Sequence, residues 1–453
     1  MVTTSIFKKG LLPVIYFFWM SMLVNAQGSL EKYIEIGLKN NLVLQEKNIS
    51  LESAMYALKT ANSFFFPSMD FKGDYQSGDG GRSISFPVGD MLNPVYRTLN
   101  QLTSGNEFPD ISNVEINFFP QNFYDLKVRT SLPIINSDLV YNRTIRKQQI
   151  TMQEYDLEIY KSELTRNIQV AYYNFLSAAK SIAIYDGALS LAQEAKRMNQ
   201  SLLDNGKSLK AYVLRSESEI QSLEAKRTSA LQQMKNARMY FNFILNTSPD
   251  EVIDTAYVLS IDQNIVDQYL LNEASINART ELKALDQSAS ICQNVLKMNK
   301  AYWVPKLNGF LDLGSQGSDW KFNNKSKYYF LGFQLDFPLF SGGRNRIKVK
   351  QSELDLKNQL INNTYTHNQI KLSADMARNS LMESYKNYEA SIKQLDAATA
   401  YNELIEKGSK EGINTFIETI DARNQLTTAS LQMVINKYQL LAALANYERE
   451  INK

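Results

Sequence analysis

Four short segments of the chain alternate apolar and polar residues. In the last of them, one face carries five apolar side chains: Tyr329, Leu331, Phe333, Leu335 and Phe337. Gly332, Gln334 and Asp336, which are polar or small, fall on the other face. A period of two predicts β-strands with one apolar and one polar face. The predicted strands cover residues 68–78, 114–133, 305–317 and 327–338.

Much longer segments carry apolar residues in steps of three, four and seven, the spacing of one helix face. The steps are clearest after two glycines, Gly206 and Gly412, and proline is absent from the longest segments. The pattern predicts helices over residues 29–66, 137–204, 209–246, 265–303, 343–410 and 414–451. A continuous helix over 137–204 would be roughly 100 Å long. Because that is too long for a globular core, we expect it to form one arm of a hairpin that turns at Gly206.

The same order of elements occurs twice along the chain. The run Leu38-Lys39-Asn40-Asn41-Leu42 lies 238 residues before Ile276-Asn277-Ala278-Arg279-Thr280, and Pro67 lies the same distance before Pro305. We therefore expect two structural repeats, residues 27–253 and 254–453. They differ mainly in a middle loop, which is longer in the first repeat. Residues 79–113, rich in Gly, Pro, Ser and Asn, are predicted to be a long surface loop.

The N-terminal residues 1–26 carry Lys8 and Lys9, then an apolar run that ends in Val24-Asn25-Ala26. This pattern is typical of a cleavable secretory signal, so we expect an exported protein. The formal net charge of +2 belongs to this segment. The remaining chain is neutral, which gives no reason to expect nucleic acid as a partner. Cys292 is the single cysteine, so no intrachain disulfide can form.

The predicted strands bear on how the chain meets a membrane, because no later stretch has the about 18 consecutive apolar residues of a transmembrane helix. One such strand alone fits a soluble sandwich. Four of them, joined to very long helices in an exported chain, favour membrane strands with Leu331, Phe333 and Leu335 facing lipid. Four strands cannot close a barrel, and an open edge in hydrocarbon leaves backbone groups unpaired. Oligomerisation is therefore required.

Three copies satisfy this requirement. Three copies of four strands give a 12-stranded β-barrel, an even number in the known range. Three copies of four helical arms likewise give 12 helices, which can form a tube that continues the barrel. The expected fold is mainly α with membrane β, in two structural repeats of long helical hairpin arms and two strands each, assembled as a homotrimer.

Four motifs resemble the outer-membrane efflux protein family typified by the TolC channel: Leu38-Lys39-Asn40-Asn41, Tyr302-Trp303-Val304-Pro305, the run Phe337–Arg344 and the stretch Gly412–Arg423. Their order and their doubling carry the resemblance, which extends over residues 27–453. It implies a trimeric outer-membrane channel with a long periplasmic α-helical barrel. Such a channel passively conducts small molecules in a tripartite efflux system, with a periplasmic adaptor protein and an inner-membrane pump as partners.

The resemblance also implies roles for particular residues. It places the turns at Gly206 and Gly412 at the periplasmic tip, in contact with the adaptor. It places Glu418 and Asp421 in a ring of acids around the closed aperture. Their spacing of three independently puts both carboxylates on one helix face. The alternative interpretation is a pair of solvated acids that the helix dipole favours near a helix start.

The closing contacts of the family do not transfer to this chain. Tyr212 stands where the family pattern has an acid, and Ser409 and Asn414 stand where it has a tyrosine and an arginine. A salt-bridge latch of that kind is therefore excluded. We expect closure to use other contacts, with Tyr212, Lys210 and Lys410 as candidates.

Nothing in the sequence indicates an enzyme, a metal site or a cofactor. His367 stands alone in a polar helical stretch, and Ser341-Gly342-Gly343-Arg344 lacks the ending of a phosphate-binding loop. Two alternatives to the efflux channel stay open: an outer-membrane duct of type I protein secretion, and a periplasmic coiled-coil adaptor protein. The sequence names neither the cargo nor the energy source of the pump.

Overall fold

The computed structural model describes residues 29–119, 121–255, 263–271 and 275–452. The predicted signal, residues 1–26, lies outside the described residues. Two compact units contain the described chain. The helical unit takes the described residues of Met1–Ala54, Gln149–Ser290 and Lys357–Lys453, and the sheet unit takes those of Met55–Gln148 and Ile291–Leu356.

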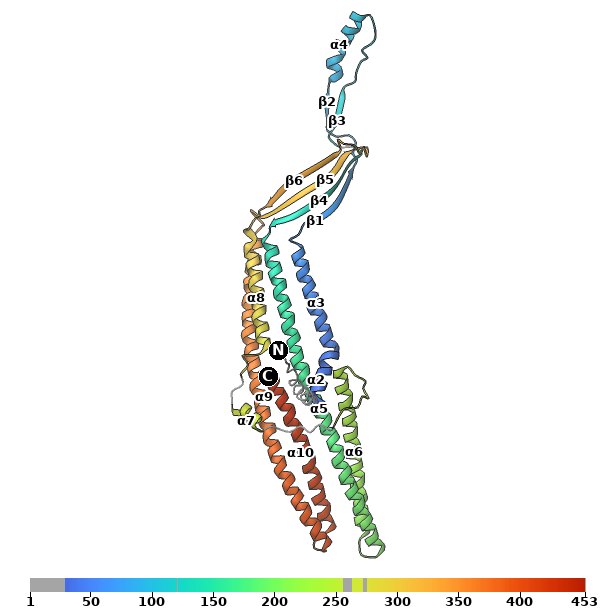
Figure 1. Ribbon diagram of the computed structural model, residues 1–453, viewed down its shortest axis with the longest axis vertical. Helices are drawn as coiled ribbons and strands as arrows, with labels where there is room; N and C mark the ends of the chain where they lie inside the picture. Colours follow the sequence, from blue (N-terminus) through green and yellow to red (C-terminus); the bar gives the residue numbers. More distant parts are fainter. Residues whose placement is uncertain (1–28, 120, 256–262, 272–274, 453) are drawn as a thin grey trace, which may run out of the picture. The chain divides into compact units, whose positions relative to one another are not determined.

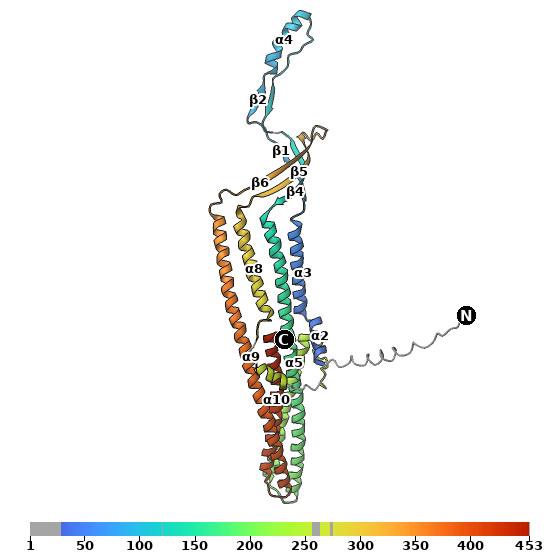
Figure 2. The same cartoon turned by 60° about the vertical axis from the view of Figure 1, so that its left-hand side comes forward.

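Two helical hairpins dominate the helical unit (Figure 1, Figure 2). Each has a longer first helix, α5 (Ser137–Asp204) or α9 (Arg344–Lys410), whose first residues belong to the sheet unit. Each continues after a short turn into a second helix, α6 (Lys210–Leu245) or α10 (Phe416–Ile451). These segments are free of proline, so every interior residue can donate its backbone N–H to the helix ladder. The mainly α fold with two repeats, predicted from the sequence, is confirmed.

The main core of the helical unit lies where α2 (Ser29–Asn40) packs against the long helices. Its fully buried members include Ile168, Tyr172 and Leu176 of α5 and Phe241 of α6. The ring of Tyr33 on α2 meets the edge of Phe241 at 5.1 Å between centroids. Large aromatic side chains thus join elements from both ends of the first repeat, which stabilises them mainly through burial of apolar surface.

The predicted helix 29–66 is wrong in its continuity, because α2 stops at Asn40 and α3 (Leu42–Ser63) begins at Leu42. The buried side chain of Asn41 explains the break. Its Oδ1 accepts the backbone N–H of Leu44 at 3.1 Å, as a capping residue does, and its Nδ2 donates to the carbonyl of Ile244 at 3.0 Å. Asn41 therefore starts a new helix and fixes it to the end of α6.

The predicted helix 265–303 is divided as well. The structure has α7 (Gln263–Leu271), then α8 (Thr280–Lys300) and the 3₁₀ turn η2 (Ala301–Trp303). Arg279, just before α8, is 3% exposed and donates to the backbone carbonyl of Glu450 at 2.9 Å. Arg279 lies 238 residues after Asn41, the repeat offset found in the sequence. The two break residues thus act alike, because each anchors a helix start to the last carbonyls of its own repeat's second hairpin arm.

The sheet unit contains a four-stranded sheet in the order β1-β4-β5-β6, with each neighbouring pair antiparallel. The strands are β1 (Ser68–Gln76), β4 (Phe123–Ile135), β5 (Lys306–Ser318) and β6 (Lys327–Asp336). The first repeat supplies β1 and β4, and the second supplies β5 and β6. The two repeats therefore meet in the pairing of β4 with β5.

The prediction for residues 79–133 needs correction in two respects. The surface loop 79–113 contains β2 (Ser83–Phe86) and the helix α4 (Val88–Thr103). The single strand predicted over 114–133 is two strands, because β3 (Val114–Asn117) pairs with β2 and not with the main sheet. Asn122 separates them with a φ of 48°, a left-handed conformation that ends an extended strand. Among the described helices, none is long and apolar enough to cross a membrane.

Candidate functional site

The two hairpin turns share one backbone geometry. Gly206 has a φ of +70° and Gly412 a φ of +73°. After α5, the N–H of Gly206 donates to the carbonyl of Leu203 and the N–H of Lys207 to that of Leu202, both at 2.8 Å. After α9, Gly412 and Ile413 bond in the same pattern, to Ser409 and Gly408. Both turns are therefore Schellman motifs, in which glycine supplies the left-handed residue.

We expect Gly412→Ala to destabilise the second hairpin by about 1 kcal/mol, because an alanine Cβ disfavours the left-handed conformation. No atom lies within 4 Å of the position of that Cβ, so crowding does not contribute. Thermal unfolding of the detergent-solubilised protein measures the effect. Gly187→Ala, in the middle of α5 and equally uncrowded, is the matched control. It should stabilise the protein by about 0.5–1 kcal/mol, and equal effects of the two variants would contradict the conformational explanation.

Glu418, a predicted aperture residue, forms a capping box at the start of α10. Its carboxylate accepts the backbone N–H of Thr415 at 2.6 Å, while its own N–H donates to the Thr415 hydroxyl. The hydrogen bond from the Thr415 backbone, together with one from its hydroxyl, holds the pKa of Glu418 below its ordinary value. The exposed carboxylate is thus fully charged at neutral pH, and it also fixes the first turn of its helix.

Asp421, the second predicted aperture residue, lies one turn further along α10 and is exposed. Its carboxylate accepts a hydrogen bond from the Gln425 side chain at 2.8 Å. Among the hydrogen bonds of the described chain, Glu418 is thus bonded just before α10 and Asp421 within it, and neither carboxylate is bonded to another helix. Two negative charges close to the turn at Gly412 are left facing solvent, and their place at an aperture stays a prediction.

The two hairpins contact each other close to their turns. The rings of Tyr212 on α6 and Phe416 on α10 lie 5.3 Å apart. Further along α10, Arg423 donates to the backbone carbonyl of Leu191 on α5 and to the carboxylate of Glu406 on α9, both at 3.3 Å. The sequence singled out Tyr212 as a contact residue near the turns but did not identify Phe416 and Arg423 in that role. An aromatic residue shortly after each glycine turn was the signal available for the ring pair.

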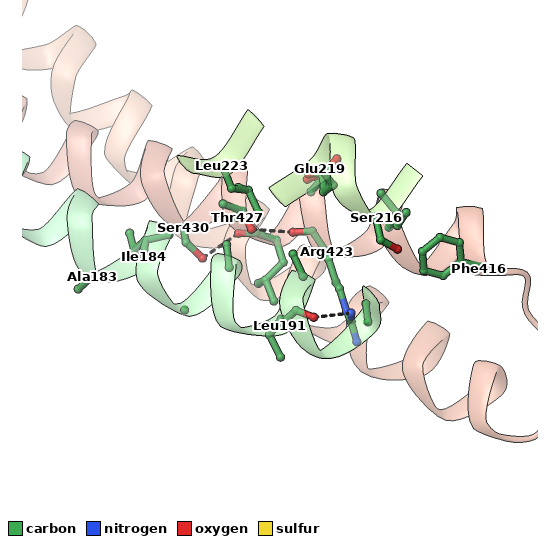
Figure 3. A pocket seen from close by; sticks show the side chains of 17 residues that line it. Ala183, Ile184, Leu191, Ser216, Glu219, Leu223, Phe416, Arg423, Thr427 and Ser430 are labelled. Carbon is green, nitrogen blue, oxygen red and sulfur yellow. Dashed lines mark hydrogen bonds between the residues drawn. The ribbon is translucent and has the colours of Figure 1, made fainter. Parts of the chain in front are cut away.

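An apolar groove of about 260 Å³ lies between α5, α6 and α10 (Figure 3). Small residues of α5 form its floor: Ala183, Gly187, Ala188, Ala192 and Ala195. Leu223 of α6 and Phe416 of α10 line it too, and Figure 3 shows Arg423 reaching across it to Leu191. Most of the exposed lining is apolar, so the groove is suited to holding an apolar surface.

The predicted lipid-facing residues Leu331, Phe333 and Leu335 lie on one face of β6 and are 64%, 69% and 65% exposed. The register continues this face across the sheet, because Phe71 of β1, Val128 of β4 and Leu313 of β5 lie in one row with Tyr329. Exposed apolar side chains thus cover one face. That lipid contacts this face stays a prediction.

The opposite face of the sheet is charged. Arg129 of β4 holds Asp312 of β5 through two hydrogen bonds of 2.7 and 2.5 Å. Asp125 pairs with Lys127 and accepts the Tyr328 hydroxyl at 2.7 Å. One face of the sheet is therefore apolar and the other carries a network of ion pairs, a division that water on both sides does not favour.

The remaining chemical candidates stay isolated. His367 is an exposed residue of α9, and the free thiol of Cys292 is half-buried in α8. Within the described part of the chain, no three His, Cys, Asp or Glu side chains gather closely enough to hold a metal ion.

Comparison with known proteins assigns the class. The family model described as outer membrane efflux protein matches residues 34–247 and 270–449. The chain therefore belongs to the outer membrane efflux protein family, the family that the sequence motifs resemble. Each matched range lies within one of the two repeats.

Solved channel structures share the fold. The chain is similar to the outer-membrane channel OprN, with 15% identity, a TM-score of 0.74, and coverage of 93% of this chain and 89% of that one. The CmeC outer membrane channel of Campylobacter jejuni also has 15% identity, with a TM-score of 0.73 and coverage of 93% and 85%. At such identities the likeness concerns the fold alone.

One relative is named for a different role. The alkaline protease secretion protein AprF of Pseudomonas aeruginosa is 21% identical over 296 residues, which are 62% of this chain. The match spans 60% of the length of that relative.

Proposed function

We propose that three copies of this chain form a passive duct through the outer membrane. The supporting observation is the four-stranded sheet, with one exposed apolar face, one ion-paired face and two open edges at β1 and β6. Lipid suits the exposed apolar face, and water suits the face with the ion pairs. Pairing the edges of three copies gives a closed barrel of 12 strands and leaves no backbone group unpaired in hydrocarbon.

We propose further that a periplasmic adaptor protein and an inner-membrane pump complete the system, with the adaptor docking near Gly206 and Gly412. The apolar groove between α5, α6 and α10 supports this, since it lies close to the turns and fits the apolar stripe of a partner helix. The conducted cargo is small molecules. The name of AprF favours protein secretion as a second function. The neighbouring gene would distinguish the two functions, since a secretion ATPase gene indicates protein secretion and a pump gene indicates efflux.

Extraction and conductance test the duct. We expect the protein to stay with the outer membrane during osmotic shock, to need detergent for release, and to conduct ions after reconstitution in planar bilayers. Release by osmotic shock alone would contradict the channel and favour the soluble coiled-coil adaptor.

The aperture has a test of its own. We expect the double variant Glu418→Gln, Asp421→Asn to lower the preference for cations in planar bilayers, because three copies lose six negative charges at one axis. Glutamine keeps an acceptor for the Thr415 cap, so the change removes charge with little effect on the helix start.

The matched control for the aperture variant is Glu403→Gln, an exposed acid on α9. It should leave conductance and ion preference unchanged. An ion preference in the double variant equal to that of the unaltered channel would remove Glu418 and Asp421 from the aperture.

A further inference from the structure

The segment between β1 and β4 forms a small structure that the second repeat lacks. It consists of the ribbon of β2 and β3 with α4 joined to it (Figure 2). In the second repeat, the corresponding strands β5 and β6 are joined by the eight residues 319–326. The repeat architecture therefore does not require α4, and a separate role has to account for it.

One face of α4 is covered by the chain that follows it. Asn93 exchanges two hydrogen bonds with the backbone of Ile111, both at 2.9 Å. Asn100 does the same with Phe108, at 2.7 and 3.0 Å. Arg97 forms an ion pair with Asp110 at 2.9 Å. These contacts hold the helix in place without using its other face.

The uncovered face carries a regular apolar stripe. Met91, Val95 and Leu102 are 71%, 52% and 77% exposed, and Thr98 is exposed between them. The four positions follow steps of four, three and four, the spacing of the core positions of a coiled coil. The covered residues Asn93, Arg97 and Asn100 fall at outer positions of the same heptads. The free stripe thus has the geometry for packing against another helix.

Charge decides which partner this stripe fits. A lipid surface favours basic residues beside the apolar stripe of a helix, but the one basic residue of α4, Arg97, is paired on the covered face. The other charged residue, Asp90, accepts a hydrogen bond from Asn113. The stripe therefore has no charge to repel an identical stripe. The ribbon adds an exposed apolar face of its own, formed by Ile84, Phe86, Val114 and Ile116.

We propose that α4 is an association helix, which packs through Met91, Val95, Thr98 and Leu102 against α4 of the other copies. The proposal rests on the three-copy duct proposed above, because tethering to one assembly raises the effective concentration of α4 to the millimolar range. A stripe of only three turns then suffices, although a free helix of this length would associate weakly.

Disulfide trapping in the full chain tests this contact. In a Cys292→Ser background, Leu102→Cys should form a disulfide between copies under mild oxidation, seen as a dimer band on a denaturing gel. Three thiols around one axis leave one unpaired, so the dimer is the expected product. Thr103→Cys, the next residue and at an outer position of the same heptads, is the matched control and should form at least about tenfold less dimer.

A second variant and an independent measurement separate the outcomes. Adding Met91→Glu to Leu102→Cys should lower the dimer yield about tenfold, because the stripe then buries a charge in each copy. The mass of the detergent-solubilised complex reports the trimer itself. A trimeric mass with equal dimer yields at positions 102 and 103 overturns the association of α4 and leaves the duct intact. A monomeric mass overturns the three-copy duct, and with it the association of α4 that rests on the duct. Labelling of position 102 by a photoreactive lipid, without dimers, also overturns the proposal.

Discussion

Phe333→Arg should prevent most of the protein from assembling in the outer membrane. Phe333 lies on β6 with its side chain 69% exposed, opposite Gly309 on β5. If this face meets lipid, an arginine near the middle of the bilayer costs about 2–4 kcal/mol in each copy. A trimer contains three such charges, so the effect on assembly is larger than for one chain. The yield of trimer in the outer-membrane fraction is the measurement.

Gln334→Arg provides a close control for Phe333→Arg. The two positions are adjacent on one strand, they receive the same new side chain, and successive residues of a strand point to opposite faces. Gln334 shares its face with the charged network of Arg129 and Asp312. We expect near-normal assembly of this variant. Equal yields of the two variants would show that the apolar face is not the lipid face.

The second large effect is expected at Arg279. Its guanidinium, 3% exposed, donates two hydrogen bonds to Glu281, at 2.8 and 2.7 Å, and one to the Glu450 carboxylate at 2.6 Å. Arg449 contacts the same two carboxylates at 3.0 Å. Arg279→Met leaves two partly buried carboxylates with one cation between them. We expect a loss of about 3 kcal/mol of stability, the lower end of the range for breaking a buried pair.

Arg197→Met is the control for Arg279→Met. Arg197 has its side chain 81% exposed and pairs with Glu194 at 3.7 Å, so the same substitution should change stability by at most about 0.5 kcal/mol. Thermal unfolding compares the two variants. Hydrogen exchange at the start of α8 should rise in Arg279→Met alone, because this residue anchors Thr280. Equal unfolding midpoints for the two variants would refute the anchoring role.

The same network sets a dependence on acid. Burial raises the pKa of Glu281, but the hydrogen bonds and charge of Arg279 outweigh it, so the net pKa lies below the ordinary 4.5. A depressed pKa in the folded state stabilises the fold above about pH 4.5, and that stability is lost as the pH falls through the folded-state value. The unaltered protein should therefore lose stability below pH 4.5, and Arg279→Met should lose less over the same interval.

The long helices and their turns could be predicted because their causes are local. Apolar residues every three to four positions, the absence of proline and a glycine just after the last turn specify α5, α9 and the Schellman turns without reference to distant residues. The strands of the main sheet followed from alternation in the same way. The family resemblance supplied the class of channel, which the match of the family model then established.

The errors of prediction have distant causes. The sequence around Asn41 predicts a continuous helix. The helix breaks there because the Asn41 side chain donates a hydrogen bond to the carbonyl of Ile244, 203 residues away. The insertion reads as a loop because α4 contains Pro94 and is bordered by glycines and serines. Contacts with residues 108–113 hold α4 in place, and no local sequence pattern predicts these contacts.

The sequence by itself thus determined the two repeats, the helical hairpins and the alternating strands, since period, glycine and proline act through the backbone nearby. Only the tertiary structure decided which polar groups form hydrogen bonds and ion pairs within the chain. It assigned Glu418 to a helix cap, Arg279 to a buried anchor and Arg97 to the covered side of α4. The partner of a charged residue cannot be identified from the sequence, because ion pairs and hydrogen bonds form between residues that only folding brings within about 3 Å.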